Sequence, residues 1–168
     1  MFCVGDKIVY PMYGAGVIED LEHKSVDGGL TNNIYYVLSI PVGNLKIMLS
    51  ANKAEHLGVR EISCSDEVIN IIESIMTEPV DMPENWNERY KLNMEKIKTG
   101  HLSEAALVFR NLMIREQKRV LSSAEKKVLT NAKQVILSEL ILSLCIEKSE
   151  AEAILMRTLE KSVFAASV

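Results

Sequence analysis

The chain has 168 residues and a mass of 18.8 kDa, which suits one compact domain or two small ones and excludes a large multidomain enzyme. Its hydrophobic content of 48% is enough to bury a core, and its aromatic content of 5% makes that core mainly aliphatic. The best candidate for a membrane span, residues 135–146, contains Glu139 and falls short of the roughly 18 apolar residues that a spanning helix needs. The N-terminus shows no basic stretch followed by an apolar segment. We therefore expect a cytoplasmic protein with no membrane partner.

Cysteine spacing gives no sign of a structural framework. Cys3, Cys64 and Cys145 are odd in number, far apart and free of any C-x-x-C motif, and the three histidines are equally scattered. We expect reduced, partly buried thiols, no disulfide and no metal site.

The net charge of −4 hides an uneven distribution along the chain. Residues 86–133 contain eleven Lys or Arg against five Glu, so this third of the sequence is basic and the remainder is acidic. A local basic excess is typical of a surface that binds phosphates. It is equally typical of the solvent-exposed faces of amphipathic helices, and composition alone leaves both interpretations open.

The first 58 residues have the pattern of a small β domain. A run of β-branched and aromatic residues fills 34–40, and residues 45–50 alternate between apolar and polar side chains. Turn-forming residues at 27–29 and 43–44 separate the candidate strands. About five short strands result, and a sheet this small is stable when it curls on itself. We predict a Tudor-like or SH3-like barrel over residues 1–58.

After Gly58 the apolar period changes to that of helices. Pro79 and Pro83 interrupt the pattern, and the motifs Ser122-x-x-Glu125 and Ser149-x-x-Glu152 have the form of capping boxes that open helices. We predict five helices, beginning near Ser65, Asn85 or Trp86, Ser103, Ser122 and Ser149. The predicted fold class is α+β, with a β-barrel followed by an all-α domain over residues 59–168.

No constellation with the spacing of a catalytic site is present. The glycines of Gly14-Ala15-Gly16 lack the third glycine of a dinucleotide-binding loop and are more typical of a tight turn between strands. We find no nucleophile with an adjacent base, no paired carboxylates and no metal-ligand set. The sequence predicts a protein that is not an enzyme and that has no cofactor and no small-molecule substrate.

The only tryptophan, Trp86, lies at a predicted helix start beside Arg89 and Lys91. An exposed indole at this place could stack on a nucleobase while the two cations hold flanking phosphates. The helical spacing of Trp86 with Tyr90 and Met94 is instead what a core-facing stripe would show. From the residues alone, burial is the favoured interpretation.

Ten short segments of the chain form a recognisable series. In the first part they are residues 4–11 (VGDKIVYP), 13–18 (YGAGVI), 35–38 (YYVL), 42–48 (VGNLKIM) and 58–60 (GVR). In the second part they are residues 85–86 (NW), 89–91 (RYK), 94–100 (MEKIKTG), 121–122 (LS) and 125–127 (EKK). On these segments the chain resembles the CarD/CdnL family of bacterial transcription regulators, whose N-terminal module is shared with the transcription-repair coupling factor. The resemblance extends from residue 2 to about residue 160 in one order.

This resemblance implies a Tudor-like domain that docks on the β subunit of RNA polymerase and a helical domain that contacts promoter DNA at the upstream edge of the melted region. It implies that Trp86 is a wedge at the minor groove, which reverses the interpretation of Trp86 as a core residue. Arg89, Lys91, Lys126 and Lys127 are the implied backbone contacts, largely independent of DNA sequence. The expected function is stabilisation of the open complex, by a protein located at the nucleoid through RNA polymerase.

Two positions depart from the family pattern. Glu88 stands where some relatives have a cation beside the tryptophan, which weakens the local attraction for phosphate. Met48 stands where some members present an arginine to the polymerase, and Lys24 fits a basic polymerase-facing position better. We predict a polymerase-binding surface that contains Lys24, Lys46 and Met48. The alternative function is that of a polymerase-binding adaptor whose helical domain recruits a protein rather than DNA.

Overall fold

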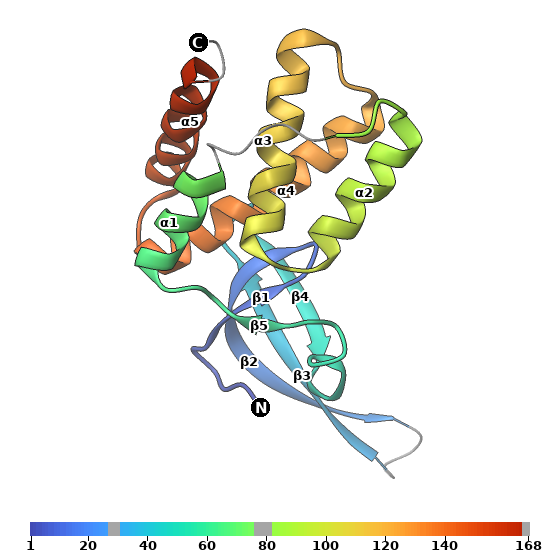
Figure 1. Ribbon diagram of the computed structural model, residues 1–168. Coiled ribbons are helices and arrows are strands. Elements are labelled where there is room, and N and C mark those ends of the chain that lie inside the picture. The colour runs from blue at the N-terminus through green and yellow to red at the C-terminus, as the bar shows by residue number, and fades with distance from the viewer. Residues whose placement is uncertain (27–30, 76–81, 166–168) are drawn as a thin grey trace.

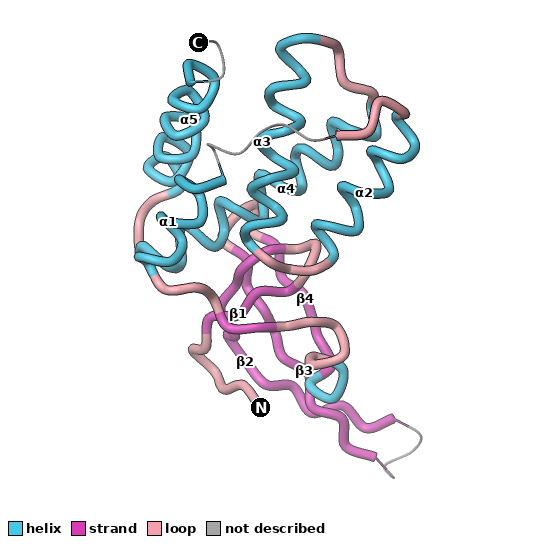
Figure 2. Tube along the Cα trace, viewed as in Figure 1, coloured by secondary structure: helices cyan, strands magenta, loops and turns pink. Residues whose placement is uncertain are grey.

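The computed structural model describes residues 1–26, 31–75 and 82–165 and shows a β-sheet below a group of helices (Figures 1 and 2). The strands are β1 (Lys7–Tyr10), β2 (Gly14–Val26), β3 (Thr31–Ile40), β4 (Leu45–Ser50) and β5 (Arg60–Glu61), with a short 3-10 helix, η1, at Ala51–Lys53. The helices are α1 (Ser65–Ile75), α2 (Trp86–Lys98), α3 (Leu102–Lys118), α4 (Ser123–Leu144) and α5 (Lys148–Ala165). The predicted α+β class is confirmed.

The sheet is antiparallel and has the strand order β4-β3-β2-β1-β5. The sheet is curled and barrel-like, as predicted, but it is not closed, because β4 and β5 are its two edges and do not pair with each other in the described part of the chain. The last strand, β5, pairs with β1 and lies two residues beyond the domain boundary that we predicted at 58/59. The sheet has its own core, composed of Ile8, Ile18, Tyr36, Leu38, Ile40, Leu49 and Ala54.

Strands β2 and β3 form a long hairpin that extends away from the helices (Figure 1). Their pairing runs from Val17↔Ser39 to Val26↔Thr31, with an irregularity in register between Ile18 and Asp20. The turn predicted at 27–29 lies outside the described residues, as does Pro79.

The helices enclose a separate aliphatic core with buried residues from all five helices. Helix α2 begins as predicted, since the side chain of the N-cap Asn85 accepts a hydrogen bond from the backbone N–H of Asn87. The capping box of Ser122 and Glu125 is present at the start of α4. The capping box predicted at Ser149 is wrong: α5 begins at Lys148, and the backbone N–H of Glu147 donates to the side chain of Glu150 instead.

Helix α4 joins the helical part to the sheet through hydrogen bonds to the β1–β2 turn. Ser138 Oγ accepts from the backbone N–H of Ala15 at 2.8 Å, and Asn131 Nδ2 donates to the carbonyl of Met12 at 2.6 Å. The buried carboxylate of Glu139 accepts hydrogen bonds from Nη1 and Nη2 of Arg60 at 2.8 and 2.9 Å. Arg60 lies in β5, which pairs with β1. These contacts fix the sheet and the helices relative to each other.

Two further sequence expectations concern cysteines and membranes. All three cysteines are free and exposed, so the expectation of partial burial was wrong because none of them lies on a core-facing position. Within the described ranges no single helix is long and apolar enough to cross a membrane, and α4 with α5 meets the length and composition requirement only as a pair bent by 116°.

Candidate nucleic-acid interface

The first turn of α2 presents Trp86 to solvent. Trp86 is 54% exposed. Further along the same helix, Tyr90 is half-buried and Ile97 is fully buried. The Asn85 cap fixes the backbone on which Trp86 stands. A large apolar side chain that solvent reaches at a fixed helix start is available for contact with a partner.

Arg89 is not available for DNA, and its predicted role as a backbone contact requires correction. The residue is 1% exposed, and its guanidinium pairs with Glu125 at 2.6 Å from Nη2 to Oε1. Its Nη1 donates to the carbonyls of Pro83 and Glu84 at 2.8 and 3.0 Å. Arg89 therefore holds the segment before Trp86 and ties the start of α2 to the start of α4.

Glu125 is the centre of this network. Burial raises its pKa, but hydrogen bonds from Ser122 and Arg89 outweigh burial and hold the pKa below its usual value. A second cation, Arg115, lies with its Nε at 3.8 Å from the same carboxylate oxygen. This burial could not be predicted from local sequence, because Arg89 and Glu125 are 36 positions apart.

Lys91, Lys126 and Lys127 are exposed, as the predicted role requires. Lys127 lines a mainly apolar groove between α2 and α4, together with Tyr90, Met94 and Val128. Tyr90 is four residues after Trp86 and thus on the same side of α2. The groove therefore begins one helical turn from the indole, and Lys127 contributes the positive charge on its rim.

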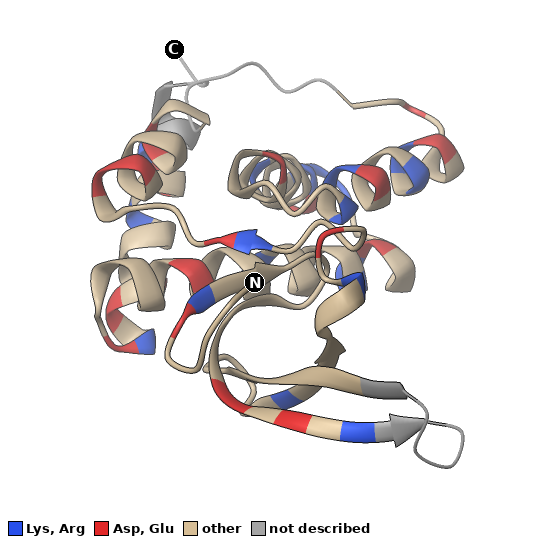
Figure 3. Cartoon of the chain, turned by 90° about the horizontal axis from the view of Figure 1, so that it is seen from below, with Lys and Arg blue, Asp and Glu red and all other residues tan. Residues whose placement is uncertain are grey.

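The helical half of the molecule carries mixed charge on α2, as the view from below shows (Figure 3). Glu88 is exposed in the first turn of α2, next to Trp86. A carboxylate there stabilises the helix N-terminus and repels phosphate at the same place. This arrangement matches the departure from the family pattern that the sequence showed.

The predicted polymerase-binding residues Lys24, Lys46 and Met48 lie on one face of the sheet. Lys46 and Met48 are alternate residues of β4 and so project to the same side. Lys24 Nζ lies 3.3 Å from the sulfur of Met48 and 5.9 Å from the centre of the Tyr35 ring. The structure therefore brings the three predicted residues together.

Sequence reasoning missed the neighbours that complete this face. Lys46 pairs with Glu19 at 2.8 Å, which raises the pKa of Lys46 and lowers that of Glu19. Glu22 pairs with Lys24 at 3.6 Å, and Tyr35 lies opposite Glu22 in the register. Strand alternation places Tyr35 on the outer face, and this was the signal that could have identified it. The face is thus mixed in charge rather than basic.

In the described residues, an open five-stranded sheet is joined to a five-helix domain that exposes Trp86 at the start of α2. Among the described residues no group of His, Cys, Asp or Glu is arranged to hold a metal ion. Residues 2–63 match the CarD-like/TRCF RID domain, and residues 67–156 match the CarD C-terminal domain. The chain belongs to the CarD family, and the resemblance seen in the sequence is confirmed.

One relative matches most of the chain in a single alignment. The protein is 36% identical over 140 residues to "Putative transcription factor YdeB" of Bacillus subtilis (strain 168), which covers 83% of this chain and 90% of that protein. The family points to a transcription regulator rather than an enzyme. The N-terminal sheet is accordingly Tudor-like, although it is not closed.

Proposed function

We propose that this protein binds the β subunit of RNA polymerase through its sheet and contacts promoter DNA at the upstream edge of the bubble through its helical domain, so that the open complex is stabilised. It would act in the cytoplasm, at the nucleoid, wherever polymerase carries it. The family assignment to transcription regulators and the exposed Trp86 support this proposal. It involves no metal, cofactor or small-molecule substrate.

The exposure of Trp86 is the observation that carries the proposal. Burying the apolar surface of a tryptophan is favourable, and the only tryptophan of the chain is 54% exposed at a capped helix start. A partner that covers Trp86 therefore gains the free energy of burying this surface. The guanidinium of Arg89 donates to two backbone carbonyls and pairs with one carboxylate, and these contacts fix this helix start. An exposed indole on a fixed helix start is suited to insert beside an unstacked base step.

Such a wedge acts through differential binding. Duplex DNA in the closed complex offers stacked steps, whereas the edge of a bubble offers an unstacked one, so the indole binds the open state more tightly. A preference of about 1.4 kcal/mol shifts the closed-to-open ratio tenfold. Lys91, Lys126 and Lys127 would add contacts to phosphates that do not depend on sequence.

Recruitment by polymerase would supply the local concentration that this surface needs. The net charge is −4 and Arg89 is buried, so few cations remain to hold naked DNA. Docking through the face that contains Lys24, Lys46 and Met48 makes DNA contact intramolecular. We expect weak affinity for isolated duplex, and a submicromolar dissociation constant at physiological salt would contradict this expectation.

The test is the lifetime of open complexes formed by the cognate RNA polymerase on a promoter that melts unstably. Wild-type protein should lengthen this lifetime, and Trp86→Ala should remove the effect while polymerase binding stays intact. Leu57→Ala is the matched control, since it also removes an exposed apolar side chain, 42% exposed, but from the sheet half of the molecule. Thermal unfolding should be the same for all three proteins.

The alternative is an adaptor whose helical domain recruits a protein. The groove between α2 and α4, with Tyr90 and Met94 in its wall, is the observation that favours this second candidate. An adaptor would bind polymerase normally but leave open-complex lifetime unchanged, with or without the Trp86 substitution.

A further inference from the structure

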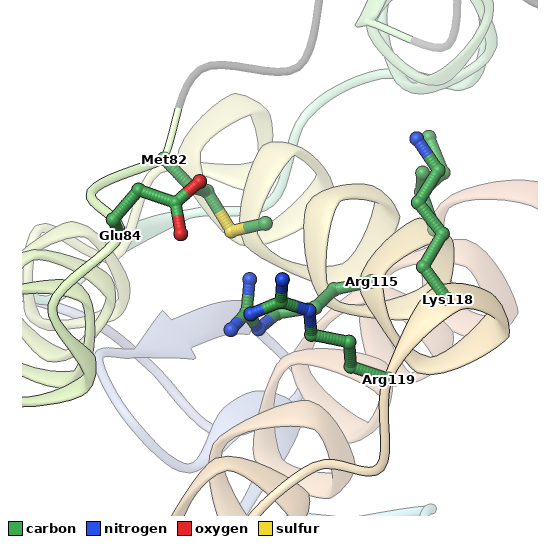
Figure 4. Close-up of a pocket in the computed structure, with 6 residues that line it drawn as sticks. Met82, Glu84, Arg115, Lys118 and Arg119 are labelled. Carbon is green, nitrogen blue, oxygen red and sulfur yellow. The ribbon is translucent and has the colours of Figure 1, made fainter.

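A second cluster of cations surrounds a hollow at the end of α3. The hollow has a volume of about 350 Å³ and is lined by Met82, Glu84, Ile114, Arg115, Lys118 and Arg119. In the close-up view the guanidinium groups of Arg115 and Arg119 point into the same part of the hollow, across from the Glu84 carboxylate (Figure 4).

The backbone fixes the two arginines in this arrangement. Arg119 is the C-cap of α3, and its N–H donates to the carbonyl of Arg115 at 2.8 Å. The chain then turns into an extended conformation at Arg119, with φ −150° and ψ 144°. Two cations four residues apart at a helix end repel each other. The helix dipole favours cations in this turn but does not explain why two of them converge on one hollow.

The charges of this cluster are not balanced. Glu125 lies 3.8 Å from Arg115, but it pairs more closely with the buried Arg89, at 2.6 Å. Within the part of the chain that the structure describes, no carboxylate lies within ion-pair distance of Lys118 or Arg119. Arg115, Lys118 and Arg119 line the hollow and Arg89 lies behind it, so these four cations, set against Glu125 and Glu84, leave two positive charges uncompensated. This is the electrostatic environment that binds a phosphate group.

The hollow is adjacent to Trp86 along the chain. Glu84 lines it, and Trp86 follows two residues later, so their Cα atoms are at most about 7 Å apart. Arg89 holds the carbonyls of Pro83 and Glu84, which fixes this short segment between the hollow and the indole. DNA carries one phosphate per strand for about every 3.4 Å of its axis, so a strand in contact with Trp86 has phosphates within the distance that separates Trp86 from Glu84.

We propose that the hollow formed by Glu84, Arg115, Lys118 and Arg119 is an anion site that takes one backbone phosphate of the DNA strand whose base step contacts Trp86. The inference rests on the proposed function for the identity of the ligand. Arg115 and Arg119 supply the planar donors that phosphate oxygens accept, and Lys118 adds a point charge. The Glu84 carboxylate opposes anion binding and weakens the site.

The first arm of the test measures binding of the full-length protein to a forked duplex at a series of low salt concentrations. Arg119→Gln should lower the affinity and reduce the slope of log K against log salt by about 0.7 to 0.9, the contribution of one phosphate. Arg157→Gln, an exposed arginine of α5, removes the same charge elsewhere and should leave the slope unchanged. Glu84→Gln should tighten binding, an effect that a purely structural role for this carboxylate would not produce.

The second arm uses inorganic pyrophosphate as the probe and follows its effect on thermal unfolding at constant ionic strength. Pyrophosphate should stabilise the wild type and the Arg157→Gln variant but not the Arg119→Gln variant. If Arg119→Gln loses the pyrophosphate effect but keeps the full DNA salt slope, the hollow binds free phosphates and its assignment to DNA is wrong. If neither arm distinguishes Arg119→Gln from Arg157→Gln, there is no anion site.

These outcomes are separable from failure of the proposed function. That function fails when Trp86→Ala leaves open-complex lifetime unaltered. The anion site fails on the Arg119→Gln slope, whatever the result for Trp86. A wild type that binds no forked duplex even at the lowest salt would overturn the assignment to DNA.

Discussion

The guanidinium of Arg89 and the carboxylate of Glu125 form a buried ion pair that joins the first turns of α2 and α4. The two side chains are 2% and 5% exposed and are 2.6 Å apart from Nη2 to Oε1. Because Trp86 stands three residues before Arg89 and Lys126 and Lys127 follow Glu125, this pair sets the relative position of the indole and the two lysines. The candidate interface thus depends on the Arg89–Glu125 pair, which is buried inside the protein and is not part of the exposed surface.

Removing one member of this pair should be strongly destabilising. Arg89→Met leaves the Glu125 carboxylate buried without its main partner and frees the carbonyls of Pro83 and Glu84, so we expect a loss of about 3 to 5 kcal/mol in the free energy of unfolding. Urea denaturation followed by the fluorescence of Trp86, the only tryptophan, measures the loss directly. Lys91→Met, an exposed neighbour on the same helix, is the control and should cost less than about 0.5 kcal/mol. Equal stability of the two variants would contradict the structural role of Arg89.

The low pKa of Glu125 predicts acid sensitivity of the same contact. A carboxyl whose pKa is lower in the folded state stabilises the fold fully above its unfolded value of about 4.5, and this contribution is lost as pH falls through the lower folded value. Wild type and Glu125→Gln should therefore differ most in unfolding temperature near pH 7 and converge as the pH falls below the lowered pKa of Glu125 in the folded state. Calorimetry across pH 3–7 provides the comparison. A difference that stays constant with pH would show that Glu125 contributes through shape rather than charge.

The sequence predicted the parts of the fold that depend on near neighbours. The Asn85 cap and the box of Ser122 and Glu125 are local patterns, and both are present. The alternation of residues 45–50 also placed Lys46 and Met48 on one face of the sheet. What could not be predicted is where a cation of the basic segment points. Arg89 and Lys91 are equivalent in the sequence, but a partner 36 positions away buries Arg89 and leaves Lys91 exposed.

A second ion pair, between Arg60 and the fully buried Glu139, connects the sheet to the helices. We call this contact the joint between the two parts. The Glu139 carboxylate is fully buried and accepts from Arg60 and from the backbone N–H of Ser63 at 2.9 Å. Glu139→Gln keeps the shape but removes the charge, and we expect a loss of about 3 kcal/mol. Glu152→Gln breaks the half-exposed pair with Lys133 and should cost less than about 1 kcal/mol.

The Arg60–Glu139 contact should also affect function. Because Arg60 belongs to the sheet and Glu139 to α4, loosening their contact should uncouple polymerase docking from DNA contact. The Glu139→Gln variant should bind polymerase as the wild type does but lengthen open-complex lifetime less, at a temperature where it remains folded. A lifetime equal to that of the wild type would mean that the joint serves stability alone.

The mixed charge of the outer sheet face predicts how polymerase binding responds to substitution. Lys24→Glu places a second carboxylate beside Glu22 and removes the contact with the Met48 sulfur, so capture of the polymerase β subunit should fall at least several-fold. Lys53→Glu makes the same charge change in the exposed 3-10 helix η1 and serves as the control. Equal capture of both variants would remove Lys24 from the proposed docking surface.

Gly100 illustrates how a single backbone position supports both parts of the molecule. Its φ of +74° lies in the left-handed region, and a Cβ atom there would lie 2.8 Å from Cγ of Pro11 in the β1–β2 turn. Its carbonyl also accepts from Arg60 Nε and Nη2 at 3.0 and 2.8 Å.

Gly100→Ala should therefore combine the cost of the left-handed conformation, about 1 to 2 kcal/mol, with displacement of Pro11 and weakening of the Arg60 contact. Gly43→Ala, with φ +84° and no atom within 4 Å of the added Cβ, has the conformational cost alone. Chemical denaturation should show Gly100→Ala to be clearly less stable than Gly43→Ala, and equal losses would mean that Pro11 moves aside without consequence for the joint.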